Sequence, residues 1–466
     1  MLVASDPARS AALADALTAV LPAGRVLVGE AVPDDYAHDE ALTVTPVRPA
    51  ILVRPESTAE VAEVLRLADD HGVPVTARGS GTGLSGAAVP DPNGVLISFE
   101  RMAAVLEIDT ENHTATVQPG VTLEQLDAAL APHRLVYPVF PGEYSASLGG
   151  NVATNAGGMR AVKYGVTRHQ VLGLEAVLAG GEVIRTGGKF VKATSGYDLT
   201  QLITGSEGTL AVVTEATLRL YPRLEHTATI LVPFTTLDEV TAAVPRILDR
   251  GVGPLILEYI DLLTMSVVTE FVGLDLGIPE SVRTAALAYL VVQIEQRTAE
   301  RLDEDVAELG ELLADLGALD VYVLPSTAGE KLIEAREKAF WAAKANGADD
   351  IVDIVVPRAS VPEFMALVAE IADEHSTWIA GCGHAGDGNV HLSVFQGDVE
   401  TRYAVLRRLF AAGMDLGGAI SGEHGIGTAK QRWFLELEDP AKLALMRRIR
   451  AAFDPDGVLN PGTLLD

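Results

Sequence analysis

Two histidines, His384 and His391, lie on either side of the turn Ala385-Gly386-Asp387-Gly388-Asn389. The segments before and after this turn, 376–380 and 390–395, have the apolar composition of two short strands. On one continuous strand an odd offset would place the two imidazoles on opposite faces. Glycine and asparagine allow the backbone to double back, so the two histidines can converge on one point. This hairpin constrains the surrounding fold more than any other feature of the chain.

A carboxylate and a third imidazole follow in a second glycine-flexible loop, residues 420–427, which contains Glu423 and His424. Two histidines plus one carboxylate form a known ligand set for zinc or another divalent metal, with one position left open for substrate. We therefore expect His384, His391 and Glu423 to bind a metal, with Zn²⁺ the favoured ion. The alternative is two satisfied core histidines and an unrelated Glu-His pair, which explains one histidine better than it explains the whole set.

Composition limits the classes of protein to consider. A chain of 466 residues is too long for one ordinary core, so two or more domains are expected. With 48% hydrophobic and 21% charged residues, it has the composition of a well-packed globular protein. The formal charge of −29 argues against nucleic acid or an anionic membrane surface as partner. No apolar run approaches the ~20 residues of a membrane span.

The cysteine content and the N-terminal sequence indicate the cellular compartment of the protein. Cys382 is the only cysteine, which excludes an internal disulfide and an iron–sulfur cluster held by several thiolates. The N-terminus carries Asp6 and lacks the basic-then-apolar pattern of an export signal. We therefore expect a cytoplasmic protein.

The first glycine-rich loop follows a predicted strand. Periodicity and capping signals predict a helix over 8–21, a strand over 52–55, a helix from the capping box at 57–60 to about residue 71, and a strand over 73–78. That strand runs directly into Gly79-Ser80-Gly81-Thr82-Gly83-Leu84-Ser85-Gly86. So much glycine lets backbone amides approach an anion, and the hydroxyls add donors. Because such turns are also common without a ligand, this loop alone leaves phosphate binding open.

A second glycine-rich stretch lies further along the chain. It is preceded by a predicted hairpin over 104–118 and a helix over 122–133, and it runs without periodicity from 138 to 158. A loop of that length and glycine density inside a compact domain is usually functional. Together with the first loop, it could line the opposite side of an extended dinucleotide. A strand over 211–220 then closes this part of the chain.

These motifs, in this order, resemble the flavoprotein superfamily of vanillyl-alcohol oxidase and para-cresol methylhydroxylase (PCMH). Within it the chain is similar to the branch of D-lactate dehydrogenase, glycolate oxidase and D-2-hydroxyglutarate dehydrogenase. The matching segments are 78–86, 147–158, 163–167, 205–210, 383–391, 421–427 and 459–462. The resemblance implies an α+β fold: a two-subdomain PCMH-type FAD-binding domain, not a Rossmann fold, plus an α+β cap domain with a mainly antiparallel sheet.

The resemblance also implies the FAD-binding residues. They are Arg78, Gly79, Ser80, Gly81, Thr82, Gly83, Ser85, Gly86, Pro141, Ser147, Gly150, Asn151, Thr154, Gly157, Gly158, Tyr164, Glu207, Gly208, Val213 and Asn460. Some relatives attach FAD covalently through a histidine in the first glycine loop. Thr82 occupies the candidate position here, so we expect non-covalent FAD.

From about residue 227 the pattern alternates between strands and helices, which suits a cap with helices on one face of its sheet. Strands are expected over 229–234, 255–260, 288–294, 320–324 and 351–356, and helices after 236 and over 297–316, 331–346 and 440–453. We divide the chain into an N-terminal helical segment (1–44), the FAD-binding domain (45–223), the cap with the substrate and metal site (224–430) and a C-terminal segment that returns to the FAD domain (431–466).

The implied reaction is oxidation of a D-2-hydroxy acid to the 2-oxo acid, with hydride passed to flavin N5. In an extended loop adjacent side chains point opposite ways, so Glu423 can hold the metal while His424 faces the substrate as base. Arg336 could form a bidentate pair with the substrate carboxylate. A surface pairing of Arg336 with Glu334 or Glu337 is an equally good interpretation.

The sequence constrains the substrate and the electron acceptor less than it constrains the type of reaction. Relatives specific for 2-hydroxyglutarate carry a lysine in the strand before the proline that matches Pro357, whereas residues 351–356 contain no cation. D-lactate is therefore favoured, and glycolate is next. Without cysteines for a cluster, the electrons should pass to a separate quinone, cytochrome, electron-transfer flavoprotein or iron–sulfur subunit, which could attach the protein peripherally to a membrane. A homodimer is compatible with the sequence.

Other functions account for parts of the sequence. A D-2-hydroxyglutarate dehydrogenase shares the motifs, and so does a non-catalytic FAD subunit of a glycolate oxidase-type complex, although the latter does not need the histidine and glutamate set. A metal-dependent hydrolase would use the same ligands but no FAD loops. A glycine-rich binding protein would hold neither metal nor flavin.

Overall fold

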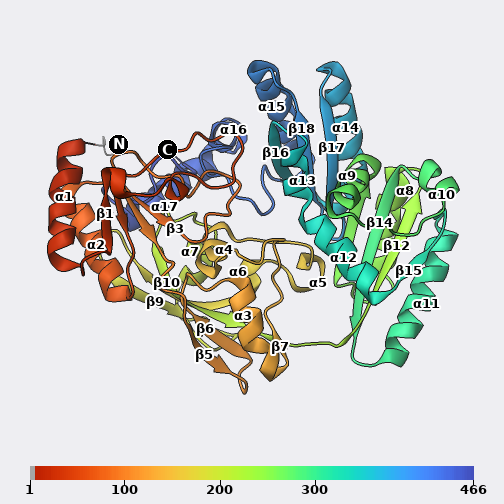
Figure 1. The fold of residues 1–466 in the computed structure, drawn as a ribbon, viewed down its shortest axis with the longest axis horizontal. Coiled ribbons are helices and arrows are strands. Elements are labelled where there is room, and N and C mark those ends of the chain that lie inside the picture. Colours follow the sequence, from red (N-terminus) through yellow and green to blue (C-terminus); the bar gives the residue numbers. More distant parts are fainter. Residues whose placement is uncertain (1–5, 466) are drawn as a thin grey trace.

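The computed structural model describes residues 6–465, and they form two halves that meet along one side (Figure 1). One half contains a four-stranded and a five-stranded sheet. The four-stranded sheet has the order β1-β2-β4-β3, with parallel pairing of β2, β4 and β3. The five-stranded sheet has the order β5-β6-β10-β8-β9 and is antiparallel throughout. The strands are Val26–Val28, Ile51–Val53, Val75–Arg78, Val95–Ser98, Val105–Asp109, Thr114–Val117, Val171–Val177, Val183–Gly187 and Val212–Arg219 for β1–β6 and β8–β10.

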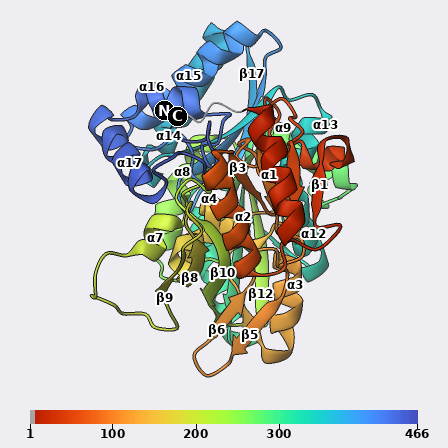
Figure 2. The ribbon, with the colours of Figure 1, turned by 90° about the vertical axis from the view of Figure 1, so that its left-hand side faces the viewer.

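Two helices cover the four-stranded sheet, α1 (Pro7–Val20) and α2 (Thr58–His71), and they lie side by side in Figure 2. Ser57 caps α2 by accepting the Glu60 N–H at 3.3 Å, as the capping box predicts. Leu13 and Leu17 of α1 are buried, whereas Val20 at the end of the helix is 51% exposed. Shorter elements of this half are α3 (Leu123–Leu130), β7 (Leu135–Val136), α4 (Leu148–Thr154), α5 (Ala161–Tyr164), α6 (Thr167–Gln170), α7 (Leu199–Ile203) and β11 (Tyr221–Pro222).

The other half is built on a seven-stranded antiparallel sheet, here called the cap sheet, with the order β15-β12-β14-β13-β17-β18-β16. Its strands are β12 (His226–Phe234), β13 (Ile256–Asp261), β14 (Ala288–Gln296), β15 (Tyr322–Leu324), β16 (Asp350–Val355), β17 (Trp378–His384) and β18 (Asn389–Phe395). The strands predicted for the cap all lie in this sheet. Together with the two sheets of the other half, it confirms the α+β fold with a mainly antiparallel cap.

Helices cover both faces of the cap sheet, so the expectation of helices on one face was wrong. The helices α8 (Leu237–Leu248), α11 (Ala299–Asp315), α14 (Val361–Glu374) and α15 (Val399–Asp415) bury the larger core on one face. The helices α9 (Leu262–Val272), α12 (Ser326–Glu337) and α13 (Ala339–Ala345) pack on the other. The short α10 (Glu280–Ala285) lies between β13 and β14 in the chain. Strands buried on both faces lose the alternation that marks a one-sided sheet.

Two local departures from the predictions have simple causes. The single helix expected over 331–346 is split between α12 and α13, because Lys338 (φ −82°, ψ 7°) leaves the helical conformation. The unperiodic stretch 138–158 contains α4, which starts where the Ser147 hydroxyl accepts the Gly150 N–H at 3.3 Å. A helix this short and glycine-rich gives no periodic signal.

The C-terminal segment returns to the first half. After α16 (Gln431–Leu437) and α17 (Pro440–Phe453), residues Val458 and Leu459 join the core beneath α1 and α2. Val75 of β3 donates its N–H to Val458 O and accepts the Asn460 N–H, both at 2.8 Å. The Asn460 amide also donates to Glu207 O at 2.8 Å. No described helix is long and apolar enough to cross a membrane.

Candidate active site

The hairpin β17–β18 brings the two histidines together, as the glycine turn predicts. In its register Cys382 lies opposite His391 and His384 lies opposite Asn389. The two histidines are therefore diagonal neighbours on one face of the cap sheet, within reach of each other. Their Nε2 atoms are 3.1 Å apart.

Glu423 completes a compact group with the two histidines. Its Oε1 lies 3.3 Å from His384 Nε2 and 3.2 Å from His391 Nε2. The three atoms thus form a triangle with nearly equal sides, and they are one of the sets able to hold a metal ion among the described residues. Zinc bonds of ~2.0–2.1 Å in tetrahedral geometry place neighbouring ligand atoms about 3.3 Å apart. The donor atoms and their spacing fit a divalent metal.

A glutamate that the sequence analysis missed orients this group. Glu258 of β13 is fully buried, and its Oε1 accepts the Nδ1–H of His384 at 2.6 Å. Because a carboxylate accepts, Nδ1 carries a proton, and when the ring is neutral its Nε2 lone pair faces the other two candidate metal ligands. Its signal was present in the sequence, since Glu258 is a lone charge inside the apolar strand 255–260.

The electrostatics of the group follow from burial and charge. Burial alone would lower the pKa of His384, but the charges of Glu258 and Glu423 raise it well above its usual range. Burial also opposes ionisation of Glu423, yet the adjacent His384 and His391 hold its pKa well below the usual value. Burial lowers the pKa of His391. In this group the carboxylates are therefore ionised and one positive charge is favoured. A metal cation bound between the three ligands would supply that positive charge as well.

His424 lies against this group, with its ring centroid 5.2 Å from that of His391. Burial lowers the pKa of His424 to about 4, against the opposing charge of Asp353. The ring is therefore neutral at neutral pH and can accept a proton. Its position fits the predicted role of a base.

Asp353, on β16, holds the loop that carries Glu423 and His424. One of its oxygens accepts the backbone N–H groups of Gly422, Glu423 and His424 at 2.9, 2.7 and 3.0 Å. The other accepts the Lys430 ammonium at 2.6 Å. Sequence reasoning noted the absence of a cation on this strand and missed that Lys430 reaches it from elsewhere. Lys430 is 3% exposed and does not line the cavity described below.

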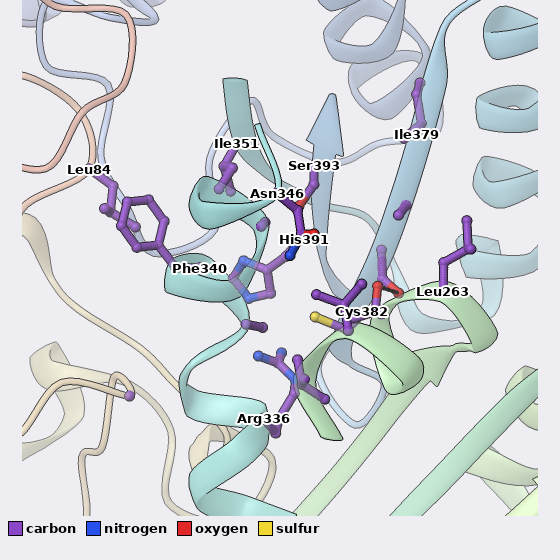
Figure 3. A pocket seen from close by; sticks show the side chains of 18 of the residues that line it. Leu84, Leu263, Arg336, Phe340, Asn346, Ile351, Ile379, Cys382, His391 and Ser393 are labelled. Carbon is purple, nitrogen blue, oxygen red and sulfur yellow. Dashed lines mark hydrogen bonds between the residues drawn. The ribbon is translucent and has the colours of Figure 1, made fainter. Parts of the chain in front are cut away.

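Arg336 is not on the helix surface, and its partner is neither Glu334 nor Glu337. It is 7% exposed and forms an ion pair with Glu258 Oε2 at 2.8 Å. Its Nε and Nη2 make no hydrogen bond with good geometry to the described residues. Nη2 is the atom of the ion pair with Glu258, whereas the guanidinium as a whole faces the space beside Cys382 and His391 (Figure 3) and offers its positive charge to a carboxylate there.

Two cavities meet at the loop of Glu423 and His424. The larger, about 680 Å³, contains Arg336 and the three candidate metal ligands in its wall. The smaller, about 170 Å³, lies over both glycine-rich loops. Four residues line both cavities: Leu84, Pro141, Glu423 and His424. A molecule bound in one cavity would therefore meet a molecule bound in the other next to His424.

Most of the predicted FAD residues line the smaller cavity. They are Gly79, Ser80, Gly81, Thr82, Gly83, Ser85, Pro141, Ser147, Gly150, Asn151, Thr154, Gly157, Glu207 and Gly208. The two loops touch: the Ser80 N–H donates to the Ser147 hydroxyl at 3.3 Å, and a Cβ on Gly79 would collide with that hydroxyl. The buried Asn151 Nδ2 has no partner among the described residues. An unpaired buried donor between two glycine loops fits a polar cofactor such as FAD.

The remaining six predicted FAD residues lie outside this cavity. Arg78 donates to the backbone oxygens of Asp35 and His38, Asn460 donates to Ala87 O, and Gly86 lies against Val44 and Thr428. The Tyr164 hydroxyl donates to Glu295 of the cap sheet at 2.7 Å. Gly158 borders the larger cavity, and Val213, with Arg78, borders a third.

Both halves of the chain match families of known proteins. Residues 49–187 match the family described as "FAD binding domain", and residues 223–464 match "FAD linked oxidases, C-terminal domain". An uncharacterised FAD-linked oxidoreductase of Mycobacterium tuberculosis is 58% identical, over 94% of this chain and 96% of its own. D-lactate dehydrogenase of Anaerostipes hadrus is 36% identical over 94% of each chain, and glycolate oxidase subunit GlcD of Bacillus subtilis is 36% identical over 89% of each.

A solved structure shows the same fold. The crystal structure of p-cresol methylhydroxylase with substrate bound superposes with a TM-score of 0.81 at 17% identity, covering 98% of this chain and 96% of that one. The chain therefore has the fold of p-cresol methylhydroxylase and belongs to the FAD-linked oxidoreductases, in the family of D-lactate dehydrogenase, glycolate oxidase subunit GlcD and D-2-hydroxyglutarate dehydrogenase.

Proposed function

We propose that the protein oxidises a D-2-hydroxy monocarboxylic acid to the 2-oxo acid, with FAD as hydride acceptor and a divalent metal beside the substrate. The observation that carries this proposal is the position of His424, which borders the cavity over the FAD loops and the cavity with Arg336 and the candidate metal ligands. The D configuration is supported by the D-lactate dehydrogenase relatives.

Different residues of the chain act on different parts of the substrate. Arg336 binds the substrate carboxylate through the charge of its guanidinium, and His424 takes the proton of the 2-hydroxyl. The hydrogen on C2 leaves with two electrons, which FAD accepts at N5 when bound. The carbon–oxygen single bond becomes a double bond, so the 2-oxo acid, a protonated base and reduced flavin balance the equation.

His384, His391 and Glu423 would hold the metal, with Zn²⁺ the favoured ion. Such an ion would supply a positive charge beside the substrate and would lower the pKa of its hydroxyl group. FAD would bind non-covalently over the loops around Thr82. The domain limits 1–44, 45–223, 224–430 and 431–466 are part of the same proposal.

The larger cavity favours a substrate with one carboxylate. Arg336 is its only lysine or arginine among the described residues. A second carboxylate, as in D-2-hydroxyglutarate, would be buried without a positive partner, at a high desolvation cost. D-lactate is the first substrate to test, and glycolate the next. A non-catalytic FAD subunit is disfavoured, since it has no use for the assembled histidines.

The electrons would leave through a separate acceptor. Cys382 is the only cysteine in the chain, so no thiolate cluster can conduct them onward. A quinone, a cytochrome, an electron-transfer flavoprotein or an iron–sulfur subunit would fill this role for a cytoplasmic enzyme that can attach peripherally to a membrane.

The test is a screen of D- and L-2-hydroxy acids with an artificial dye acceptor, together with metal and flavin analysis of the purified protein. Activity with D-acids, bound flavin and about one metal per chain are expected. His384→Ala, His391→Ala and Glu423→Ala should each lose metal and nearly all turnover while keeping FAD. A yellow, metal-loaded protein that oxidises none of the acids would contradict the proposal.

A further inference from the structure

We infer that the preferred substrate carries a large apolar side chain on C2, as in a medium-chain 2-hydroxy fatty acid or a 3-aryl-2-hydroxypropanoic acid. The inference rests on the proposed function and extends it to the part of the substrate that does not react. It comes from the region of the larger cavity beyond the candidate metal ligands.

The register of the cap sheet fixes what forms the floor of that cavity. Residues opposite each other on neighbouring strands share a face, so they form rows across the sheet. The reacting end is polar: the row of Glu258, His384 and Asn389 is followed by the row of Cys382, His391 and Asp353. The next row is Ala380, Ser393 and Ile351, and the last is Trp378 and Phe395.

These two further rows extend the floor well past the reacting end. Alternate residues of a strand are ~6.8 Å apart, so the rows lie about 7 and 14 Å beyond His391. All five of their residues line the larger cavity. Figure 3 shows Ile351 and Ser393 beyond His391, on the side away from Arg336. A substrate held by Arg336 and His424 would point its side chain along this floor.

The walls over these rows are mainly apolar, with Thr264 and Asn346 as uncharged polar members. Leu263, Val267 and Val268 of α9 and Phe340 and Ala343 of α13 line them. The strand β13 pairs with β17 only up to Cys382, because the chain turns into α9 at Leu262. The wider space beside Ala380 therefore results from the end of β13 and is closed by the side chains of a helix.

The cavity as a whole is larger than D-lactate can fill, and its part over the two further rows (Ala380, Ser393, Ile351, Trp378 and Phe395) is here called the arm. The six heavy atoms of lactate, each with the ~30 Å³ of a water molecule, need on the order of 180 Å³. The cavity measures about 680 Å³, and one end of it borders Leu84, Phe140 and Pro141 on the FAD side. The arm over Ser393 and Phe395 lies beyond both the metal ligands and that FAD side.

The arm carries no charge that would bind a second polar group. Among the described residues, its only ionisable member is Asp373, an exposed aspartate at the end of α14, which repels an anion. The arm opens to solvent between Leu263, 53% exposed, and Trp378, 74% exposed. An apolar, open-ended arm fits a hydrocarbon chain or an aromatic ring and offers nothing to a second carboxylate.

The experiment is a chain-length series with the FAD-loaded enzyme: D-lactate, D-2-hydroxybutyrate, D-2-hydroxyhexanoate, D-2-hydroxyoctanoate and D-3-phenyllactate. Each methylene buried in the arm raises kcat/KM by about fourfold at most. We expect an increase of at least about tenfold from the three-carbon to the eight-carbon acid. Calorimetric binding of 2-oxooctanoate and pyruvate gives a readout independent of turnover, and 2-oxooctanoate should bind more tightly.

Variants locate the effect in the arm. Ser393→Phe fills the third row, so the ratio of kcat/KM for the eight-carbon acid to that for D-lactate should fall by about tenfold or more. Ser266→Phe makes the same change on the exposed side of α9, away from the cavity, and should keep the wild-type ratio. If Ser393→Phe fails to fold, Ala380→Val narrows the same row with less bulk.

Failure of the inference is distinct from failure of the proposed function. The inference would be overturned if kcat/KM for D-lactate equalled or exceeded that for D-2-hydroxyoctanoate and if pyruvate and 2-oxooctanoate bound equally tightly. The proposed function would still stand in that case. A normal ratio in both Ser393→Phe and Ala380→Val would overturn it as well. Absence of turnover with every acid in the series would overturn both.

Discussion

Glu258 accepts a hydrogen bond from Nδ1 of His384 at 2.6 Å, and the same glutamate pairs with Arg336 through its other oxygen at 2.8 Å. One buried carboxylate thus orients a candidate metal ligand and the candidate carboxylate-binding arginine. Replacing it by glutamine removes its charge and half its accepting capacity. Glu258→Gln should weaken metal affinity by about 10- to 100-fold, the usual effect of losing such a partner.

Equilibrium dialysis against a zinc buffer, followed by metal analysis, checks this prediction. Glu295→Gln on the neighbouring strand β14 is a matched control, because Glu295 binds Lys163 and Tyr164 away from the histidines. Equal zinc affinity in the Glu258 variant and the wild type would show that the carboxylate does not support the metal.

His424→Ala should retain metal and flavin, since neither set of candidate ligands includes this residue. Its turnover should fall by roughly two to four orders of magnitude, the usual contribution of a general base. Steady-state rates with dye acceptor, measured beside metal and flavin content, test this. His375→Ala, at the end of α14 and outside both cavities, is the control. Normal turnover without His424 would assign the base elsewhere.

Glu337→Gln should stabilise the protein at alkaline pH. Burial raises the pKa of Glu337 to about 7, from an ordinary value of 4.5. The folded state therefore takes up a proton between these values, and its stability falls as pH rises through that window. Glutamine mimics the protonated form, so the variant should melt at the wild-type temperature near pH 4 and on the order of 1–3 °C higher at pH 8. A constant difference at both pH values would contradict the assignment.

Flavin should be released from the polypeptide by acid or heat. Thr82 has no imidazole to form the covalent link that some relatives have, and it lies in the wall of the FAD cavity. Denaturation with acid, removal of the precipitate and a visible spectrum of the supernatant test the prediction. Yellow colour that remains with the precipitate would contradict it.

Reduced flavin should react slowly with oxygen and quickly with a separate acceptor. The measurement is anaerobic reduction by a D-2-hydroxy acid, followed by stopped-flow mixing with air-saturated buffer or a quinone analogue. Reoxidation by air at the rate of steady-state turnover would make the protein an oxidase.

The sequence predicted those parts of the fold and site that have local causes. The His384–His391 hairpin depends on one glycine turn, and the N-cap of α2 depends on Ser57, which accepts the Glu60 N–H. Residues that act through distant partners were missed. Glu258 reaches His384 across 126 positions, and Lys430 reaches Asp353 across 77, and no local pattern encodes either pairing.

Arg336 illustrates the same limit. Its sequence neighbours Glu334 and Glu337 suggest a surface ion pair, but they lie two and one positions away, and such residues do not face each other on a helix. Its actual partner comes from β13, and the sequence does not reveal which face of α12 is buried. The second helix layer on the cap sheet, which places Arg336 over the histidines, was also not expected.

The return of the C-terminal segment to β3 has a consequence for how the molecule is assembled. Thr76 and Asn460, joined by a hydrogen bond, are 384 positions apart, so the edge of β3 stays uncovered while almost the whole chain is synthesised. An uncovered strand edge invites pairing with other chains. The edge of β3 therefore cannot be covered by residues 458–460 until the whole cap, which precedes them in the chain, has been synthesised.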